Sequence, residues 1–300
     1  MAGNDTVQNW RRRWLSYPAQ ALAVYPLFWL VQLLPMDWAS GLGGWLGRTL
    51  GPRLGVSRRA RHNLGRAFPD KNETEIEVIV HGMWENLGRS IFEFPHLHRL
   101  DTYAADGRVE VVGVDHVDRL KDDGQPGIFF SGHLANWEVV ALTIAQRGLP
   151  IHLIYRAPNN PLVERLFQHR RPAGCELLPK GSEGARRALK LLRDGEHLGM
   201  LVDQKMNDGI AVPFFGRDAM TAPAVAQFAL RYACPVVPIR IERLAGFRFR
   251  VTHHDPITLV KGDDRQADIH AFMTRINAYL EDWIRQRPEQ WLWLHRRWPD

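Results

Sequence analysis

From residue 109 onward, short apolar runs alternate with segments whose apolar residues recur at helical spacing. The apolar runs predict strands at Val109–Val114, Gly127–Ser131, Ile151–Tyr155, Cys175–Leu178, Leu198–Asp203 and Val236–Ile241. The segments between them predict helices at Trp137–Gln146, Pro161–His169, Glu183–Arg193 and Pro223–Tyr232. Strands and helices that alternate in this way form βαβ units. We therefore expect an α/β fold with a largely parallel sheet flanked by helices on both faces.

Two further segments complete this pattern. Residues 247–252 alternate arginine with apolar residues, which predicts a half-exposed strand at an edge of the sheet. Residues 265–286 have one apolar face and precede Pro288, so we expect a helix that ends there. No internal repeat or linker divides the region, and we expect residues 51–300 to form one domain.

The first 50 residues have a different pattern. Residues 19–35 carry no formal charge over 17 positions. Three arginines precede this run and aromatic residues flank it at the level of a lipid interface: Arg11, Arg12, Arg13, Trp10, Trp14 and Tyr17. Residues 38–50 then add small residues that permit close helix packing, namely Gly41, Gly43, Gly44 and Gly47. Within an N-terminal unit of residues 1–50, we expect residues 15–50 to form a membrane anchor, either one short span or an interfacial hairpin; a buried core helix of a soluble protein is the alternative.

The positive charge of the chain is concentrated near its N-terminus. Residues 1–66 hold nine arginines and two acidic residues, while the net charge of the whole chain is +6, so the remainder is close to neutral. A nucleic-acid enzyme usually carries its positive charge on the catalytic domain, which argues against a nucleic-acid partner. A basic N-terminus rich in tryptophan suits an anionic membrane surface, and a solvated basic face without a partner is the alternative.

The segment from Ser131 to Glu138 carries the most specific chemical signal. His133 follows a predicted strand, and Glu138 lies five residues further on. In one continuous helix these residues would point about 140° apart, but a strand, a tight turn and a helix capped by Asn136 bring them together. A neutral imidazole is the best side-chain base near pH 7, and a carboxylate on its other nitrogen fixes its tautomer. A buried loop histidine beside an unrelated surface glutamate is the alternative.

Polar residues follow several of the predicted strands and are expected at one rim of the sheet, where ligands of open α/β sheets bind. They are His133, Arg156, Lys180, Asp203 and Gln204. The sequence contains neither a phosphate-binding loop nor a dinucleotide fingerprint, and its histidine pairs lack the spacing of a zinc site. We therefore expect no cofactor and no metal. Ser131 is not framed by Gly-x-Ser-x-Gly, which argues against a hydrolase triad.

Several sequence blocks follow one another along nearly the whole chain. They are Arg61-His62-Asn63-Leu64 with Ala67-Phe68-Pro69, Gly132-His133 through Asn136-Trp137-Glu138, Tyr155-Arg156 with Asn159-Asn160-Pro161, Asp203-Gln204 with Val212-Pro213-Phe214-Phe215-Gly216 and Thr221, Pro235-Val236-Val237-Pro238, and Pro288-Glu289-Gln290-Trp291 through His295-Arg296-Arg297-Trp298. In this order they resemble the late acyltransferases of lipid A biosynthesis, the lauroyl/myristoyl acyltransferase family of Gram-negative inner membranes. Glu138 replaces the aspartate that is commoner among glycerolipid acyltransferases, and Asp203-Gln204 stands in place of their Phe-Pro-Glu-Gly-Thr block. Both features are usual in the lipid A branch.

The resemblance implies a glycerolipid-acyltransferase-like fold and the transfer of a fatty acyl chain from acyl carrier protein to a hydroxyl of a lipid A precursor. It places the protein at the inner membrane, with its catalytic domain facing the cytoplasm. His133 is then the general base and Glu138 orients it. Arg156 is the candidate for binding an anionic group, either a sugar phosphate or the phosphopantetheine of the carrier, with a structural ion pair as the alternative.

The other candidates for substrate binding are Asn136, Asp203, Gln204 and Lys180. Asp203 and Gln204 either shape the pocket or cap a turn. Lys180, with Arg170 and Arg171, forms either a basic patch for the acidic carrier protein or a solvated face. The aromatic tail packs beside an acyl tunnel, lies at the bilayer surface or fills the core: Trp291, Trp293 and Trp298. Two other functions stay open, namely acyl transfer to another glycolipid or aminolipid, and non-catalytic binding of membrane lipids.

Overall fold

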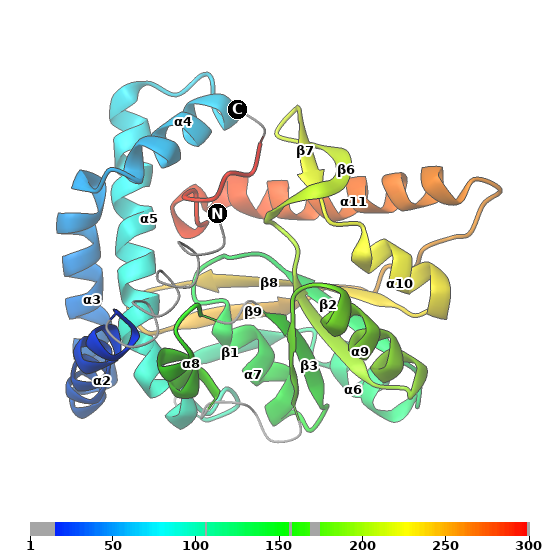
Figure 1. Cartoon of the computed structure of the whole chain (residues 1–300), viewed down its shortest axis with the longest axis horizontal. Helices are drawn as coiled ribbons and strands as arrows, with labels where there is room; N and C mark the ends of the chain where they lie inside the picture. Colours follow the sequence, from blue (N-terminus) through cyan, green and yellow to red (C-terminus); the bar gives the residue numbers. More distant parts are fainter. Residues whose placement is uncertain (1–15, 106, 156–157, 169–174, 299–300) are drawn as a thin grey trace, which may run out of the picture.

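The computed structural model describes residues 16–105, 107–155, 158–168 and 175–298. Its central sheet has the strand order β1-β9-β8-β2-β5-β3-β4 (Figure 1). The strands are β1 (Val109–Val112), β2 (Gly127–Ser131), β3 (Ile151–Tyr155), β4 (Leu177–Pro179), β5 (His197–Leu201), β8 (Val236–Arg243) and β9 (Phe249–His253). Neighbouring strands of this sheet are parallel, apart from the antiparallel pair β8 and β9. The architecture is the mostly parallel α/β sheet that the hydrophobic pattern predicts.

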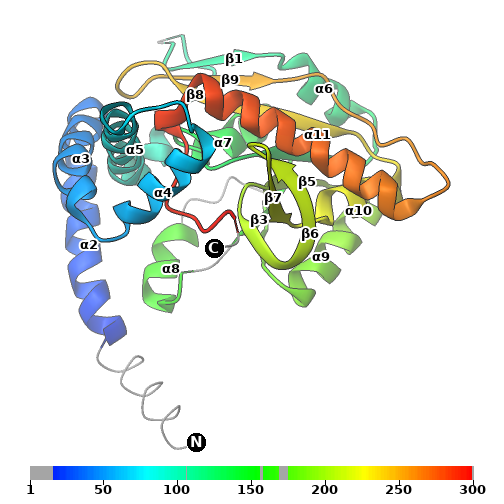
Figure 2. The same cartoon turned by 90° about the horizontal axis from the view of Figure 1, so that it is seen from above.

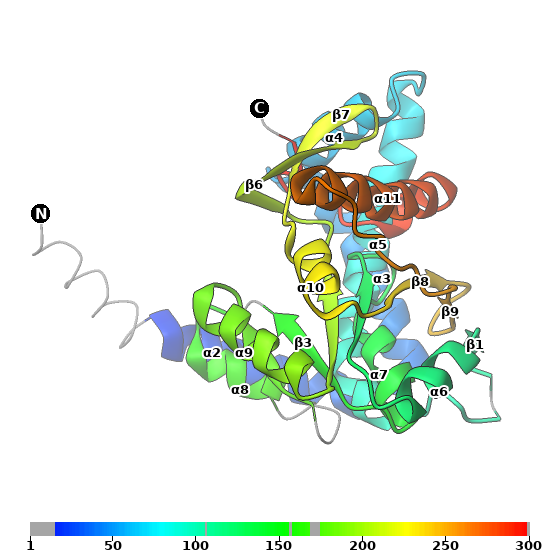
Figure 3. The ribbon, with the colours of Figure 1, turned by 90° about the vertical axis from the view of Figure 1, so that its right-hand side faces the viewer.

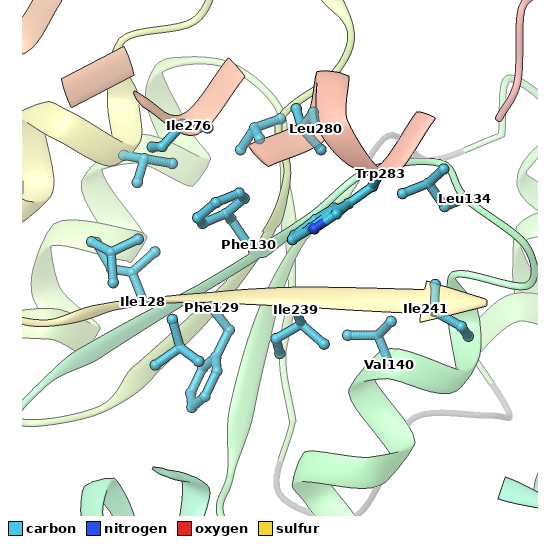
Figure 4. Packing of buried hydrophobic residues seen from close by; sticks show 14 of the residues in the cluster. Ile128, Phe129, Phe130, Leu134, Val140, Ile239, Ile241, Ile276, Leu280 and Trp283 are labelled. Carbon is cyan, nitrogen blue, oxygen red and sulfur yellow. The ribbon is translucent and has the colours of Figure 1, made fainter. Parts of the chain in front are cut away.

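Helices cover both faces of the sheet at β2. Phe130 stacks on Trp283 of α11 (Arg265–Gln286), with ring centroids 6.2 Å apart. Phe129 points to the opposite face, toward α7 (Glu138–Gln146), as Figure 4 shows. Every residue of β2 is therefore buried. A strand that is buried on both sides has a continuous apolar sequence, which is why its limits could be predicted.

The other described elements of the body are α6 (Asp115–Asp122), α8 (Pro161–Gln168), α9 (Ser182–Arg193), α10 (Ala224–Tyr232), and the 3₁₀ segments η2 (Gly51–Arg53), η3 (Phe94–Arg99) and η4 (Pro288–Gln290). Two strands missed by the sequence analysis, β6 (Lys205–Phe214) and β7 (Arg217–Thr221), form a separate antiparallel hairpin that lies against α11 (Figure 3). Each of the predicted strands and helices between residues 109 and 286 is present, with ends shifted by a few residues at most.

The predicted edge position of residues 247–252 is wrong. β9 lies inside the sheet, between β1 and β8. Its polar residues are tolerated there because the neighbouring strand supplies partners, as when Arg250 donates to the carboxylate of Glu110 over 2.9 Å. The alternating pattern indicated a strand correctly, but it could not show that β1 pairs with the free side of β9 and forms the edge of the sheet.

From Ser16 onward, the described N-terminal part contains four α-helices: α2 (Tyr17–Leu33), α3 (Met36–Leu50), α4 (Ser57–Ala67) and α5 (Glu73–Glu93). α3 runs along α5 (Figure 1), and Figure 2 shows the two helices side by side in a view nearly down their axes. A Cβ atom at Gly47 would lie 2.1 Å from the carbonyl oxygen of Trp84, and one at Gly88 would lie 2.1 Å from that of Gly43. The two helices thus touch backbone to backbone, as the small residues predict, whereas nothing lies within 4 Å of a Cβ at Gly41.

α2 and α3 expose several large apolar side chains. They include Leu22, Leu27, Trp29, Leu30, Leu33, Trp38 and Trp45, each at least half exposed. None of the described helices combines the length and the hydrophobicity needed to cross a membrane. The membrane anchor stays a prediction, as does the domain limit at residue 50, and the arginines and tryptophans predicted to flank the anchor before Ser16 lie outside the described residues.

Candidate active site

The candidate site is built on the turn that follows β2. A Cβ atom at Gly132 would lie 3.0 Å from Leu280 and 3.4 Å from the carboxylate of Asp203, so the chain passes close to α11 and to the segment that follows β5. Ala135 then adopts a positive φ of 45°, and α7 begins at Glu138. The predicted order of strand, turn and helix is confirmed. Asn136 is not the helix cap, however, because Trp137 holds that position and makes no side-chain capping bond.

His133 is held by the carboxylate of Asp203. The backbone N–H of His133 donates to Asp203 Oδ2 over 2.8 Å, and its ring Nδ1 lies 2.7 Å from Asp203 Oδ1. Trp291 Nε1 donates to the same Oδ2 over 2.7 Å. Asp203 is fully buried, whereas the side chain of His133 is 14 % exposed. One imidazole nitrogen therefore faces a buried, fully paired carboxylate, which fixes both the ring and its tautomer.

Asp203 stays ionised despite its burial. Burial raises the pKa of this carboxyl, but the charge of His133, the hydrogen bonds from His133 and the nearby His295 together hold the pKa below its usual range. An ionised Asp203 can only accept hydrogen bonds, so Nδ1 of His133 carries the proton. In the neutral form of this imidazole the lone pair is on Nε2, the nitrogen that can accept a proton.

Three more polar residues form a chain beyond His133. Lys180 Nζ donates to Gln204 Oε1 over 2.9 Å, so the amide NH₂ of Gln204 faces the other way. There Gln204 Nε2 lies 3.2 Å from His133 Nε2 and 3.3 Å from His295 Nε2. Burial, His133 and Lys180 lower the pKa of His295 to about 4, against the opposing effect of Asp203, so the neutral imidazole of His295 can accept from Gln204.

The C-terminal segment closes the back of this turn. The backbone N–H of Ala135 donates to Gln290 O over 2.9 Å, and that of Leu292 donates to His133 O over 3.2 Å. Trp291, Trp293 and Trp298 are buried. Of the three predictions for the aromatic tail, packing in the core is the one observed, and Trp291 also holds Asp203 through its N–H.

Glu138 is not the carboxylate at Nδ1. It is the first residue of α7, and its Oε1 accepts from Trp137 Nε1 over 3.1 Å. The expected partner of His133 was chosen because it is near in sequence, but β5 lies beside β2 in the sheet and brings Asp203 closer. A catalytic role for Glu138 stays a prediction.

Asn136 is placed away from solvent. It is 1 % exposed, and its Nδ2 donates to Glu93 Oε2 over 2.9 Å. The buried Glu93 also accepts from Ser40 Oγ over 2.6 Å and forms an ion pair with Arg243. Asn136 therefore ties the turn to α3, α5 and β8, which supports the site from behind.

The predicted convergence at the rim is observed for His133, Lys180, Asp203 and Gln204, whereas Arg156 lies outside the described residues. Sequence reasoning missed His295 as a member of the site, since it lies in an irregular segment without periodic signal. Among the described residues, no group of three or more histidine, cysteine, aspartate or glutamate side chains could hold a metal ion.

An apolar cavity of about 170 Å³ adjoins this turn. Ser131, Trp137 and Glu138 line one end, at the carboxyl ends of the strands. The lining continues past Phe129 toward the start of β3 at Ile151, with Ile239 of β8 (Figure 4) on the same side. The cavity thus runs from the His133 turn along the α7 face of the sheet.

Several known proteins are similar to this chain in sequence. The sequence pattern of the family described as "Bacterial lipid A biosynthesis acyltransferase" matches residues 7–300. The chain is 27% identical over 284 residues to the lipid A biosynthesis lauroyltransferase of Escherichia coli, covering 90% of this chain and 88% of the relative. It is 24% identical over 272 residues to the lipid A biosynthesis acyltransferase of Haemophilus influenzae, covering 88% and 83%.

The chain is 22% identical over 272 residues to a phosphatidylinositol mannoside acyltransferase of Mycolicibacterium smegmatis, covering 88% of each protein. The crystal structure of the 1-acyl-sn-glycerophosphate acyltransferase PlsC from Thermotoga maritima gives a TM-score of 0.39 at 9% identity, over 88% of this chain and 97% of that one. The family match spans nearly the whole chain and includes the His133 turn, Asp203 and the C-terminal segment. The protein therefore belongs to the bacterial lipid A biosynthesis acyltransferase family.

Proposed function

We propose that this protein transfers a fatty acyl chain from acyl carrier protein to a hydroxyl of a lipid A precursor. Membership of the family supports an acyltransferase that acts on lipid A or a related glycolipid. The observation that carries the finer proposal is the pairing of His133 with Asp203 beside an apolar cavity. A base next to an apolar cavity suits a reaction between a lipid hydroxyl and an acyl thioester.

His133 is the general base, and Asp203 orients it. The hydroxyl of the acceptor takes the place of the Gln204 amide at His133 Nε2 and gives its proton to that nitrogen. The hydroxyl oxygen attacks the thioester carbonyl carbon, the carbon–sulfur bond breaks, and the imidazolium returns the proton to the thiolate. Ionised Asp203 stabilises the imidazolium between these steps.

The apolar cavity is proposed to hold the acyl chain. Its end at Ser131, Trp137 and Glu138 is the end next to His133, so the thioester lies there and the hydrocarbon extends toward Ile151. Burial of hydrocarbon is worth about 0.8 kcal/mol per methylene. An acyl chain that fills the cavity would therefore bind more tightly than a shorter one, with an affinity about four times higher for each additional methylene.

Positive groups beside His133 suit an anionic part of either substrate. Lys180 and Arg59 both lower the pKa of His295, so their positive charges lie near this part of the site. Lys180 is exposed and contacts Gln204, so it can meet a phosphate of the acceptor or of the carrier's prosthetic group. The same role is proposed for Arg156.

The exposed apolar side chains of α2 and α3 support a position at a membrane. Tryptophan and leucine side chains on adjacent helices suit the lipid interface, where an acceptor with several acyl chains resides. We place this surface at the inner membrane, with the His133 site on the cytoplasmic side where acyl carrier protein is found.

Purified protein, a series of carrier-linked acyl chains and a panel of acceptors would test the function, with products identified by mass spectrometry. Transfer to a lipid A precursor is expected. Transfer only to another glycolipid would show that the acceptor is not a lipid A precursor. The similarity to the phosphatidylinositol mannoside enzyme favours this alternative. Binding of acyl chains without turnover would instead indicate a lipid-binding protein.

A further inference from the structure

The hydroxyl of Ser131 is buried without a hydrogen-bond partner. Ser131 is the last residue of β2 and is 2 % exposed. Its Oγ has no partner among the described residues. A buried hydroxyl left unpaired costs about 1–3 kcal/mol of stability, so folded proteins seldom retain one without a reason.

Every other buried serine or threonine hydroxyl in the described part of the chain is satisfied within the protein. Each donates to a carbonyl, carboxylate or amide oxygen within 2.9 Å: Ser40, Ser57, Ser90, Thr102, Thr143 and Thr221. Ser131 is therefore the exception to a consistent pattern.

The position of Ser131 indicates what its hydroxyl meets. It is two residues before His133, and it lines the end of the apolar cavity that adjoins the turn. Side chains of a strand alternate between faces, so Ser131 projects to the same face as Phe129, toward α7. The hydroxyl is thus a polar atom where an acyl chain in the cavity would present its carboxyl-derived end.

We infer that the Ser131 hydroxyl donates a hydrogen bond to the carbonyl oxygen of the acyl thioester, which makes Ser131 a catalytic residue. The inference rests on the proposed function. When the acceptor oxygen attacks the carbonyl carbon, its proton passes to His133 and the carbonyl π electrons move to the oxygen, which becomes an oxyanion. The hydrogen bond from Ser131 strengthens as this charge develops, and it weakens again when the carbonyl re-forms and the thiolate leaves.

Ser131→Ala is a clean test because the hydroxyl makes no bond within the described protein. Its removal leaves the fold intact, and we expect unfolding at the same or a higher temperature than in the wild type. The turnover number is expected to fall by about 10²–10³, the usual effect of removing one donor to an oxyanion, while KM for the acyl donor changes little. Ser57→Ala is the matched control. Ser57 donates to Gly51 O and accepts from Trp84, away from the cavity, so its loss lowers the unfolding temperature and leaves the turnover number of folded protein unchanged.

A second measurement separates this inference from the proposed function. Acyl carrier protein loaded with a ¹³C-carbonyl acyl chain is bound to each variant without acceptor, and the infrared carbonyl band is recorded. A shift to lower frequency in the wild type that is absent in Ser131→Ala supports the hydrogen bond, even if no acceptor in the panel is turned over. The same band in both variants, an unchanged turnover number, a loss confined to KM, or a covalent acyl-serine detected by mass spectrometry would each overturn it. Transfer by the wild type with any of these results leaves the proposed function standing.

Discussion

Replacing Asp203 by asparagine isolates the orienting role of this carboxylate. Asp203 Oδ2 accepts from the backbone N–H of His133 and from Trp291 Nε1, and Oδ1 faces His133 Nδ1. An asparagine with its oxygen at the Oδ2 position keeps the first two bonds and turns its NH₂ group toward Nδ1. That nitrogen must then accept, so the imidazole proton moves to Nε2 and the base loses its lone pair.

The two consequences of Asp203→Asn differ in size. The side chain keeps its volume and two of its three hydrogen bonds, and the third persists with donor and acceptor exchanged, so the free energy of unfolding is expected to fall by only about 1–3 kcal/mol. The transfer rate is expected to fall by about 10⁴, as in serine proteases when the aspartate behind the catalytic histidine becomes asparagine. That loss corresponds to roughly 5 kcal/mol in the activation barrier.

The assay measures initial rates of ester formation with carrier-linked acyl donor and lipid A precursor, alongside denaturant unfolding of each variant. Glu138→Gln is the control, since it neutralises the other candidate carboxylate while keeping its shape, and we expect it to retain more activity than Asp203→Asn. An Asp203→Asn variant that keeps a tenth or more of the wild-type rate would refute the reasoning. Equal losses in both variants would return the orienting role to Glu138.

Three further predictions concern stability and membrane binding. Burial, followed by the charges of neighbouring histidines, lowers the pKa of His253 to about 4. The unfolded chain therefore binds more protons than the folded one between about pH 6.5 and 4. As the pH drops across that window, this group should lower the free energy of unfolding by about 3 kcal/mol. The pH dependence should be weaker in His253→Gln. Gly47→Ala should destabilise the protein in thermal unfolding, because the added methyl meets a backbone carbonyl of α5. Gly41→Ala on the same helix should instead stabilise it by up to about 1 kcal/mol. Equal effects of the two substitutions would contradict the close packing of α3 on α5. Changing Trp38 and Trp45 together to serine should reduce co-sedimentation with anionic vesicles without lowering the unfolding temperature, since both side chains are more than half exposed.

Much of the fold could be predicted because its central strands are buried on both faces. A run such as Gly127–Ser131 has little freedom to be anything but a buried strand once helical patterns flank it. The same reasoning predicted that the polar site residues lie together at the carboxyl ends of these strands. His133, Lys180, Asp203 and Gln204 each follow a strand of one parallel sheet, and the structure joins them in one hydrogen-bonded chain.

The partner of His133 could not be predicted, because it depends on which strands are neighbours. β2 pairs with β5, which brings residues 70 positions apart into contact, and no local period records that adjacency. His295 and Trp291 were missed as members of the site for a related reason. They come from an irregular segment that is held by long-range bonds to the turn, including the one from Leu292 to His133.

The backbone contact between α3 and α5 has a mechanical consequence. α5 ends at Glu93, whose carboxylate binds both Ser40 of α3 and Asn136 of the His133 turn, so the apolar helix and the base belong to one stiff unit. If α3 lies in the lipid interface, as we propose, this connection sets the distance between the bilayer and the imidazole. An acceptor hydroxyl would then react only when its own headgroup places it at that distance.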